Sequence, residues 1–168
     1  MTMTYPTIDR DPSGGRVEMP LDLKAIELSR VAASKSTLFS VEQILGGARL
    51  HLEALSSITA IKLEVEKQLS RARNAIALRK SEIVLDVVPE ILRQKGLATS
   101  KSPLGSEDAR SAVIDGDPEY RRLVEVKEEL EAISSFFDKE YQNVSASHRA
   151  AMRAADSARF SNKTSFGE

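Results

Sequence analysis

The sequence of 168 residues has no cysteine and no tryptophan, and aromatic residues make up 5% of it. Without cysteine the chain has no disulfide, no thiolate metal site and no cysteine nucleophile. Five Phe and three Tyr are few of the bulky side chains that fill a compact globular core. The apolar residues are mostly Leu, Ile, Val and Ala, which favours an extended helical protein that buries apolar stripes against partner helices.

Residues that carry chemistry are also sparse. His51 and His148, the two histidines, fall on different predicted helices, and neither has the neighbours of a metal site or a catalytic triad. The segment Gly96–Ser102 lacks the glycine before its lysine that a phosphate-binding loop needs. We therefore expect no metal, no cofactor and no catalysis. No apolar segment is long enough for a signal peptide or a bilayer span, so we expect a cytoplasmic protein without membrane contact.

The chain divides into three parts by composition. Residues 1–19 contain prolines, a Gly pair and few apolar side chains, which predicts a flexible N-terminal arm. Residues 20–156 predict a helical oligomerisation and binding domain, with helices over about 21–33, 40–95 and 118–156. Residues 157–168 lose the helical period, which predicts a flexible tail.

Local signals mark the helix boundaries. Ser40 and Gln43 have the spacing of a capping box at the start of the first long helix. Pro89 predicts a kink or break before that helix ends at Gly96. Asp117 is a suitable cap, and Pro118 suits the first position of the second long helix. Residues 107–113 predict at most a short helical turn.

Both long helices carry an apolar stripe. The stripe of the first has a period of about 3.6 residues, which predicts a nearly straight helix; it comprises Ile58, Ile61, Val65, Leu69, Ala72, Ile76, Ile83 and Val87. The stripe of the second has the spacing of a coiled-coil seam, and we assign it to contacts between copies of the chain; it comprises Leu123, Val126, Leu130, Ile133, Phe137, Tyr141 and Val144. The predicted fold is all-α, an elongated long-helix hairpin or coiled-coil bundle that oligomerises.

The net charge of -1 hides opposite charges on the two long helices. Residues 67–80 carry five cations and no acid, whereas residues 117–141 carry eight acids and four bases. Nucleic-acid binding requires cations, so the candidate phosphate contacts lie on the first helix; they are Lys62, Lys67, Arg71, Arg73, Arg79 and Lys80. Two interpretations remain open: the basic helix tracks phosphates, or it pairs with the acidic helix and is neutralised.

The order of these features resembles the UvsY-type recombination mediators of tailed phages. The residues that carry the resemblance are Lys62–Lys67 (KLEVEK) leading into Arg71 and Arg73, then Ala112–Asp117 (AVIDGD) opening a helix that passes Arg149 and Arg153. The resemblance covers roughly residues 60–155. It implies a small all-helical protein that binds single-stranded DNA, forms ring-like oligomers and loads a recombinase. By the same resemblance Arg71 and Arg73 are the DNA-contacting pair, and the C-terminal helix builds the oligomer.

We therefore expect a non-catalytic, oligomeric accessory protein of DNA recombination, repair and replication. Its partners would be single-stranded DNA, a recombinase and a single-stranded-DNA-binding protein, and phosphate contacts would dominate because residues 67–80 contain no aromatic side chain. The alternative is a coiled-coil structural, scaffold or assembly-chaperone protein with no nucleic-acid role, in which the basic and acidic helices pair with each other.

Overall fold

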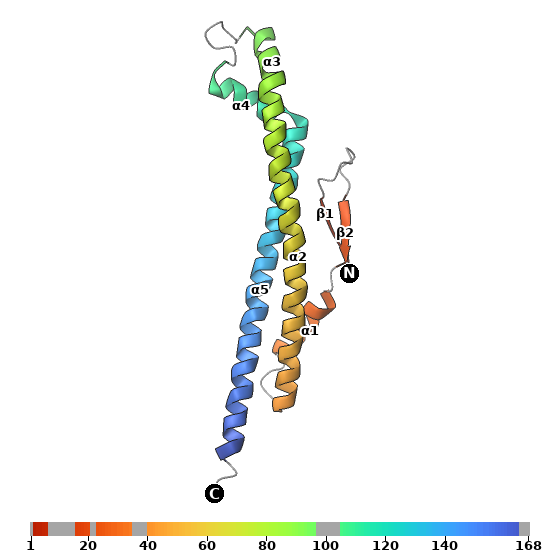
Figure 1. Cartoon of the computed structure of the whole chain (residues 1–168), viewed down its shortest axis with the longest axis vertical. Coiled ribbons are helices and arrows are strands. Elements are labelled where there is room, and N and C mark those ends of the chain that lie inside the picture. Colours follow the sequence, from red (N-terminus) through yellow and green to blue (C-terminus); the bar gives the residue numbers. More distant parts are fainter. Residues whose placement is uncertain (1, 7–15, 21–22, 35–39, 97–104, 165–168) are drawn as a thin grey trace. The chain divides into compact units, whose positions relative to one another are not determined.

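The computed structural model describes residues 2–6, 16–20, 23–34, 40–96 and 105–164 (Figure 1). Its helical elements are α1 (Leu23–Ser34), α2 (Val41–Glu82), the π-helical segment η1 (Ile83–Val87), α3 (Val88–Gln94), α4 (Glu107–Gly116) and α5 (Pro118–Thr164). Two strands, β1 (Thr2–Pro6) and β2 (Arg16–Pro20), pair in a small sheet. The all-α prediction is confirmed, because helices supply every apolar residue of the described core.

The strands β1 and β2 fall in the segment that was predicted to be a flexible arm. These strands were not predicted, because the prolines and the Gly pair of this segment indicate irregular structure. The sequences TMTYP and RVEMP nevertheless contain Thr, Tyr and Val, which favour strands. The remaining residues of the predicted arm, 1 and 7–15, lie outside the described residues.

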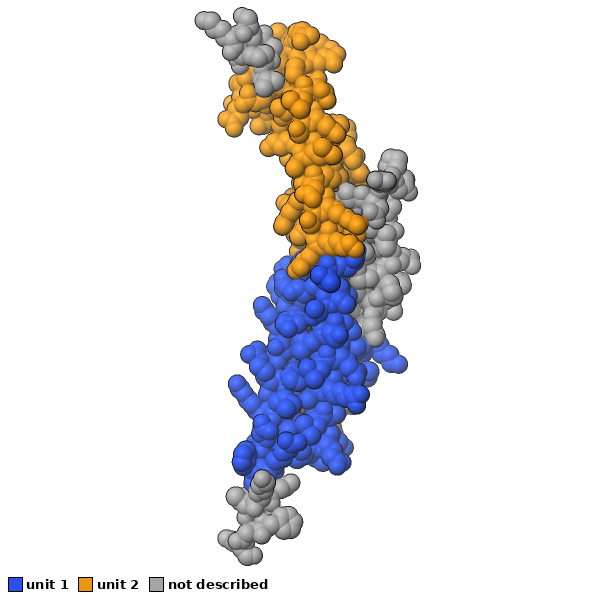
Figure 2. Space-filling view, in the orientation of Figure 1, with its two compact units in different colours: residues 1–4, 18–65, 133–168 blue, residues 5–17, 66–132 orange. Residues whose placement is uncertain are grey.

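The chain forms two compact units, and each contains a part of α2 and a part of α5 (Figure 2). Unit 1 comprises residues 1–4, 18–65 and 133–168, and unit 2 comprises residues 5–17 and 66–132. The sequence predicts a single helical domain over residues 20–156 and does not indicate this division. It falls inside α2 and α5, where no break in the helix marks a boundary.

The capping residues act as the sequence predicted. The Ser40 backbone N–H donates to Gln43 Oε1 over 3.1 Å, and the Gln43 N–H donates to Ser40 Oγ over 3.4 Å. This reciprocal pair satisfies donors that the first turn of α2 leaves unpaired. At the start of α5, Asp117 Oδ1 accepts the Tyr120 N–H over 2.8 Å, and Pro118 occupies the first helical position.

The predicted break at Pro89 takes the form of a π-helical turn. The Val88 N–H donates to Ile83 O, five residues back, which closes η1. Pro89 has no N–H and sits in the first turn of α3, where no intrahelical donor is required. The wider turn shifts the buried position by one residue. Val88 is therefore buried, and the predicted Val87 is only half-buried.

Unit 1 packs the N-terminal part of α2 antiparallel to the C-terminal part of α5. Ile44 and Ala48, near the start of α2, form one cluster with Ala151 and Ala155 of α5. Farther along α2, Lys62 pairs with the earlier Asp138 of α5. Helix α1 contacts both: its Ser29 reaches His51 of α2, and its Arg30 pairs with Glu140 of α5 over 2.8 Å.

Unit 2 is built on a cluster around the π-helical turn. Ile83, Val88 and Leu92 bury their side chains against Ile114 of α4. Ser106 caps α4 by accepting the Ala109 N–H over 3.2 Å, which extends the predicted short turn into a helix. Ion pairs of α2 with α5 then follow in antiparallel order, Arg73 with Glu131 and Arg79 with Asp117.

Four members of the predicted seam of α5 are buried within a single chain. Leu123, Leu130, Phe137 and Val144 recur every seven residues, and all four are buried within one chain. Val126 and Ile133 are half-buried, and Tyr141 is exposed. The structure accounts for the buried members by contacts within one chain, because a heptad stripe packs equally well against a helix of its own chain, and their role in contacts between copies stays a prediction.

Helix α5 also runs past its predicted end at about residue 156, to Thr164. The sequence contains no Gly or Pro between Pro118 and Gly167, so nothing stops the helix where its apolar period fades. Residues 165–168 of the predicted tail lie outside the described residues.

Candidate nucleic-acid interface

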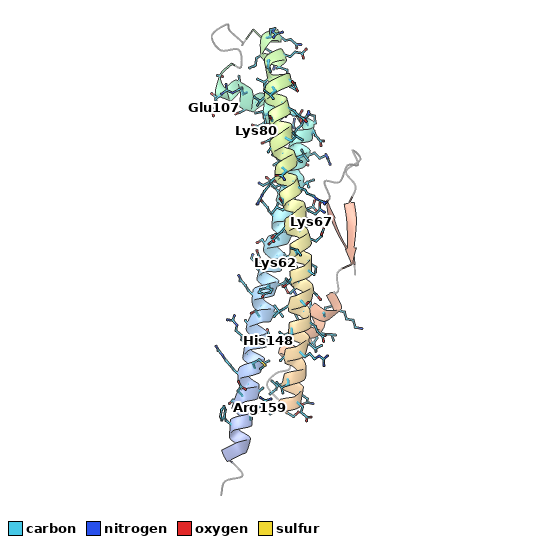
Figure 3. The ribbon with its side chains drawn as sticks, in the orientation of Figure 1. Lys62, Lys67, Lys80, Glu107, His148 and Arg159 are labelled. Atoms are coloured by element: carbon cyan, nitrogen blue, oxygen red, sulfur yellow. The ribbon has the colours of Figure 1, made fainter. Side chains whose placement is uncertain are left out.

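The six predicted phosphate contacts do not share one environment. Figure 3 labels Lys62, Lys67 and Lys80 at successive positions along α2. Lys62 is half-buried in unit 1, where its ammonium group pairs with Asp138 and lies 5.6 Å from the centre of the Tyr141 ring. A cation held by a carboxylate and an aromatic face contributes to packing first. Lys62 is therefore a poor phosphate contact.

Arg73 of α2 contacts the acidic part of α5 in unit 2. Its Nη2 donates to Glu131 Oε1 over 3.1 Å, and Lys127 Nζ lies 3.5 Å from the other oxygen of the same carboxylate. The Arg73 hydrogen bond, helped by Lys127, lowers the pKa of Glu131. The Arg73 side chain is still 59% exposed, so the pair holds the guanidinium group at the surface.

Arg79 makes the most complete ion pair of the basic stretch. Its Nε and Nη2 donate to the two carboxylate oxygens of Asp117 over 3.1 Å and 2.7 Å, and its Nη1 donates to Glu82 over 3.2 Å. The Arg79 hydrogen bond is the main cause of the lowered pKa of Asp117. Because each polar edge of the guanidinium group already has a carboxylate, Arg79 serves the fold and is a weak candidate for phosphate.

The remaining cations lie on exposed positions of α2 in unit 2. Lys67, Arg71 and Lys80 are all exposed. Arg71 follows Lys67 by four residues, and the exposed Leu78 of α2 and Leu85 of η1 follow Arg71 at steps of seven. Helical periodicity therefore puts these four residues on one side. We call this set of four residues the outer face. It combines two cations with two leucines that are 64% and 70% exposed.

The structure divides the predicted phosphate contacts into two groups. Lys62, Arg73 and Arg79, which lie beside the apolar stripe, pair with carboxylates of α5. Lys67 and Arg71, which lie opposite the stripe, are exposed, as the helical projection of the sequence indicates. Ion pairs with α5 therefore neutralise part of the basic helix, while Lys67 and Arg71 stay exposed to solvent.

The C-terminal part of α5 is a second basic segment, from which the sequence predicted no phosphate contact although Arg149 and Arg153 carry part of the resemblance. Residues 142–164 of α5 contain Arg149, Arg153, Arg159 and Lys163 and one acid, Asp156. Arg149 and Arg153 are exposed and, with Ala146 and Ala150, line a surface hollow of about 280 Å³. Helix α5 therefore has an acidic N-terminal part, residues 117–141, and a basic C-terminal part.

His51 is buried on α2 in unit 1, with 2% of its surface exposed. Its Nδ1 lies 2.6 Å from the hydroxyl oxygen of Ser29 on α1. Burial, followed by the positive charge of nearby His148, lowers the pKa of His51. A cavity of about 400 Å³ lies beside it, lined mainly by small and apolar residues. Ser29 is itself buried, and no carboxylate of the described residues contacts His51, so this Ser–His pair lacks the third group that orients the imidazole in a catalytic triad.

Comparisons with known proteins return no match for this chain, whether against family models, curated proteins or solved structures. Among the described residues, no group of three or more His, Asp or Glu side chains is placed to hold a metal ion. The described helices include none whose length and apolar content would let it cross a bilayer.

Proposed function

We propose that this protein is a non-catalytic accessory protein that binds single-stranded DNA, oligomerises and helps to load a recombinase. The observation that carries the proposal is the exposure of Lys67 and Arg71 within a stretch of α2, residues 67–80, that contains no acid. Lys80 and the surface-held Arg73 add cations to the same unit.

Binding through such a surface would be electrostatic. Each phosphate neutralised by Lys or Arg releases condensed counterions, so the logarithm of the affinity falls with the logarithm of salt by about 0.7 per contact for a single strand. Residues 67–80 contain no aromatic side chain for base stacking, which argues for phosphate contacts without sequence preference. The carboxylates that hold Arg73 and Arg79 keep the helix docked while Lys67 and Arg71 face the strand.

Self-association would raise the affinity for a single strand, because each copy adds a weakly binding surface. Linked copies bind one strand with higher avidity than a single copy. Leu78 and Leu85 are large exposed apolar side chains on the outer face, and they would supply the apolar contacts between copies. The recombinase and single-stranded-DNA-binding protein are partners implied by the resemblance to UvsY-type mediators. A protein with these partners acts in the cytoplasm, in the host if it is encoded by a phage.

A second candidate function is a helical scaffold or assembly protein without a nucleic-acid role. The ion pairs of Lys62, Arg73 and Arg79 with α5 favour it, since they assign half of the predicted phosphate contacts to the fold itself. In that case the leucines of the outer face would hold a protein partner, and the neighbouring cations would only keep the surface hydrated.

Fluorescence anisotropy with a labelled oligothymidylate at low and moderate salt separates the two functions. The double variant Lys67→Glu with Arg71→Glu should weaken binding and lower the salt slope by about 1 per lost contact. The matched control is Lys24→Glu with Arg49→Glu, which makes the same charge change at exposed positions of unit 1. No binding by the wild type at low salt, or equal loss in both variants, contradicts the DNA proposal.

A further inference from the structure

The C-terminal part of α5 presents a second cationic surface, in unit 1. Arg149 and Arg153 are exposed and lie four residues apart, which puts them on one side of the helix. Neither forms an ion pair with another residue that the structure describes. Like charges at this spacing destabilise an isolated helix, so a bound anion between them would relieve the repulsion.

The shape of this surface suits a phosphate. Arg149 and Arg153 line a hollow of about 280 Å³ whose other walls are the small side chains of Ala146 and Ala150. The Arg149 Nε donates to the Ser145 carbonyl over 3.4 Å, which leaves the other nitrogens of its guanidinium group for a ligand. Two guanidinium groups around a small-residue floor can hold one phosphate through several charge-assisted hydrogen bonds.

An aromatic ring stands on the same side of α5. Phe160 follows Arg153 by seven residues, or two helical turns, and is 70% exposed. Arg159, labelled near the end of α5 in Figure 3, lies 4.0 Å from Asp156, so the charge of this pair is largely balanced. Cations followed by an exposed ring are what a single strand requires, because bases stack on aromatics while Arg holds the backbone.

We propose that Arg149, Arg153 and Phe160 form a second contact for single-stranded nucleic acid. In this contact the two arginines hold a backbone phosphate, and the Phe160 ring stacks on an unpaired base. The inference rests on the proposed function, and it differs from the outer face in a testable way. The outer face contacts phosphates alone, whereas the α5 contact also requires an unpaired base and is therefore specific for single strands.

The chain supplies its own reporter for this contact, because it contains no tryptophan. In the full-length variant Phe160→Trp, the new indole is the only one, and a stacked base quenches its fluorescence. We expect quenching by oligothymidylate and none by an abasic oligonucleotide of equal length or by inorganic phosphate. Quenching that persists with the abasic strand overturns the stacking role.

Substitutions then separate the two halves of the contact. Phe160→Ala should weaken binding of oligothymidylate by about 5-fold or more while leaving the abasic strand unaffected. Arg149→Glu with Arg153→Glu should weaken both ligands. Exposed residues are changed in each case, and circular dichroism verifies that the helices persist. Unchanged affinity in all of these variants overturns the inference.

The outcomes also distinguish this inference from the proposed function. If the wild type binds the strand and the Lys67→Glu, Arg71→Glu variant does not, while the indole of the Phe160→Trp variant is not quenched, only the α5 contact is wrong. If the wild type binds no strand at low salt, the proposed function fails as well. Quenching or a spectral shift with anionic lipid vesicles, but not with oligothymidylate, identifies a membrane surface as the ligand and overturns the inference.

Discussion

Arg79 and Asp117 form a two-point ion pair between α2 and the start of α5, with hydrogen bonds of 3.1 Å and 2.7 Å. Asp117 has a second role at the same point, since its Oδ1 also accepts the Tyr120 N–H and caps α5. One carboxylate therefore starts a helix of 47 residues and ties it to the basic helix in unit 2. A residue that the sequence marks only as a cap is also the anchor of the predicted basic stretch.

Replacing Asp117 should destabilise the fold more than replacing a neighbouring acid. Asp117→Ala removes the cap of α5 and both hydrogen bonds of Arg79, and we expect a loss of about 1–2 kcal/mol in the free energy of unfolding. Asp115→Ala, at an exposed position two residues earlier, is the control and should cost less than about 0.5 kcal/mol. Urea denaturation followed by circular dichroism measures both.

The same carboxylate should contribute to acid sensitivity. Arg79 lowers the pKa of Asp117 in the folded state, so Asp117 stabilises the fold above its unfolded pKa of about 3.9. That contribution disappears as the pH falls through the lower folded pKa. Asp117→Asn should therefore show a smaller loss of stability over this acidic range than the wild type, and equal slopes would contradict the pairing.

A second pH dependence, nearer neutrality, should come from His51. Burial and His148 lower its folded pKa, so the unfolded chain binds the proton more readily. The free energy of unfolding should therefore be highest above about pH 6.5 and decrease as the pH falls below that value. His51→Gln should flatten the decrease in urea denaturation curves.

His148→Gln is the control for this prediction. It removes the lesser cause of the shift and leaves His51 buried against Ser29, so most of the pH dependence should remain. If the stability of the His148 variant depends as little on pH as that of the His51 variant, the pH dependence comes from the charge of His148.

The adjacent residues Phe136 and Phe137 test whether the stripe of α5 is an internal core. Phe137 is buried, whereas Phe136 is 51% exposed, and their rings meet edge to face at 5.2 Å. Phe137→Ala should cost about 3–5 kcal/mol of folding free energy, and Phe136→Ala should cost less than about 1.5 kcal/mol. If the two variants have similar melting temperatures and only Phe137→Ala loses its oligomers, the stripe is an interface between copies and not an internal core.

The leucines of the outer face should control self-association without affecting the fold. Leu78→Asp with Leu85→Asp removes two exposed apolar side chains, so the helical content should remain and the oligomers should dissociate. Mass photometry at several concentrations reads the subunit number directly. Leu52→Asp, at an exposed position of α2 in unit 1, is the control and should leave the assembly unchanged.

Local chemistry made much of the fold predictable. The capping box at Ser40 and Gln43, the cap at Asp117 and the apolar stripes depend on residues a few positions apart, so a linear pattern reveals them. The π-helical turn before Pro89 was not predictable in this way. Pro89 predicts that one backbone hydrogen bond of the helix is missing. That a π-helical turn forms there depends on the packing of Val88 against α4, which lies farther along the chain.

The candidate interface was likewise predictable from the sequence only in part. Sequence alone determined that residues 67–80 are basic and without acids and that Lys67 and Arg71 lie opposite the apolar stripe, because helical periodicity is a local property. The tertiary structure decided that Arg73 and Arg79 pair with α5 and that the heptad stripe is internal. Both depend on the register between helices far apart in the chain, and the same stripe and charges would pack against either their own chain or a second copy.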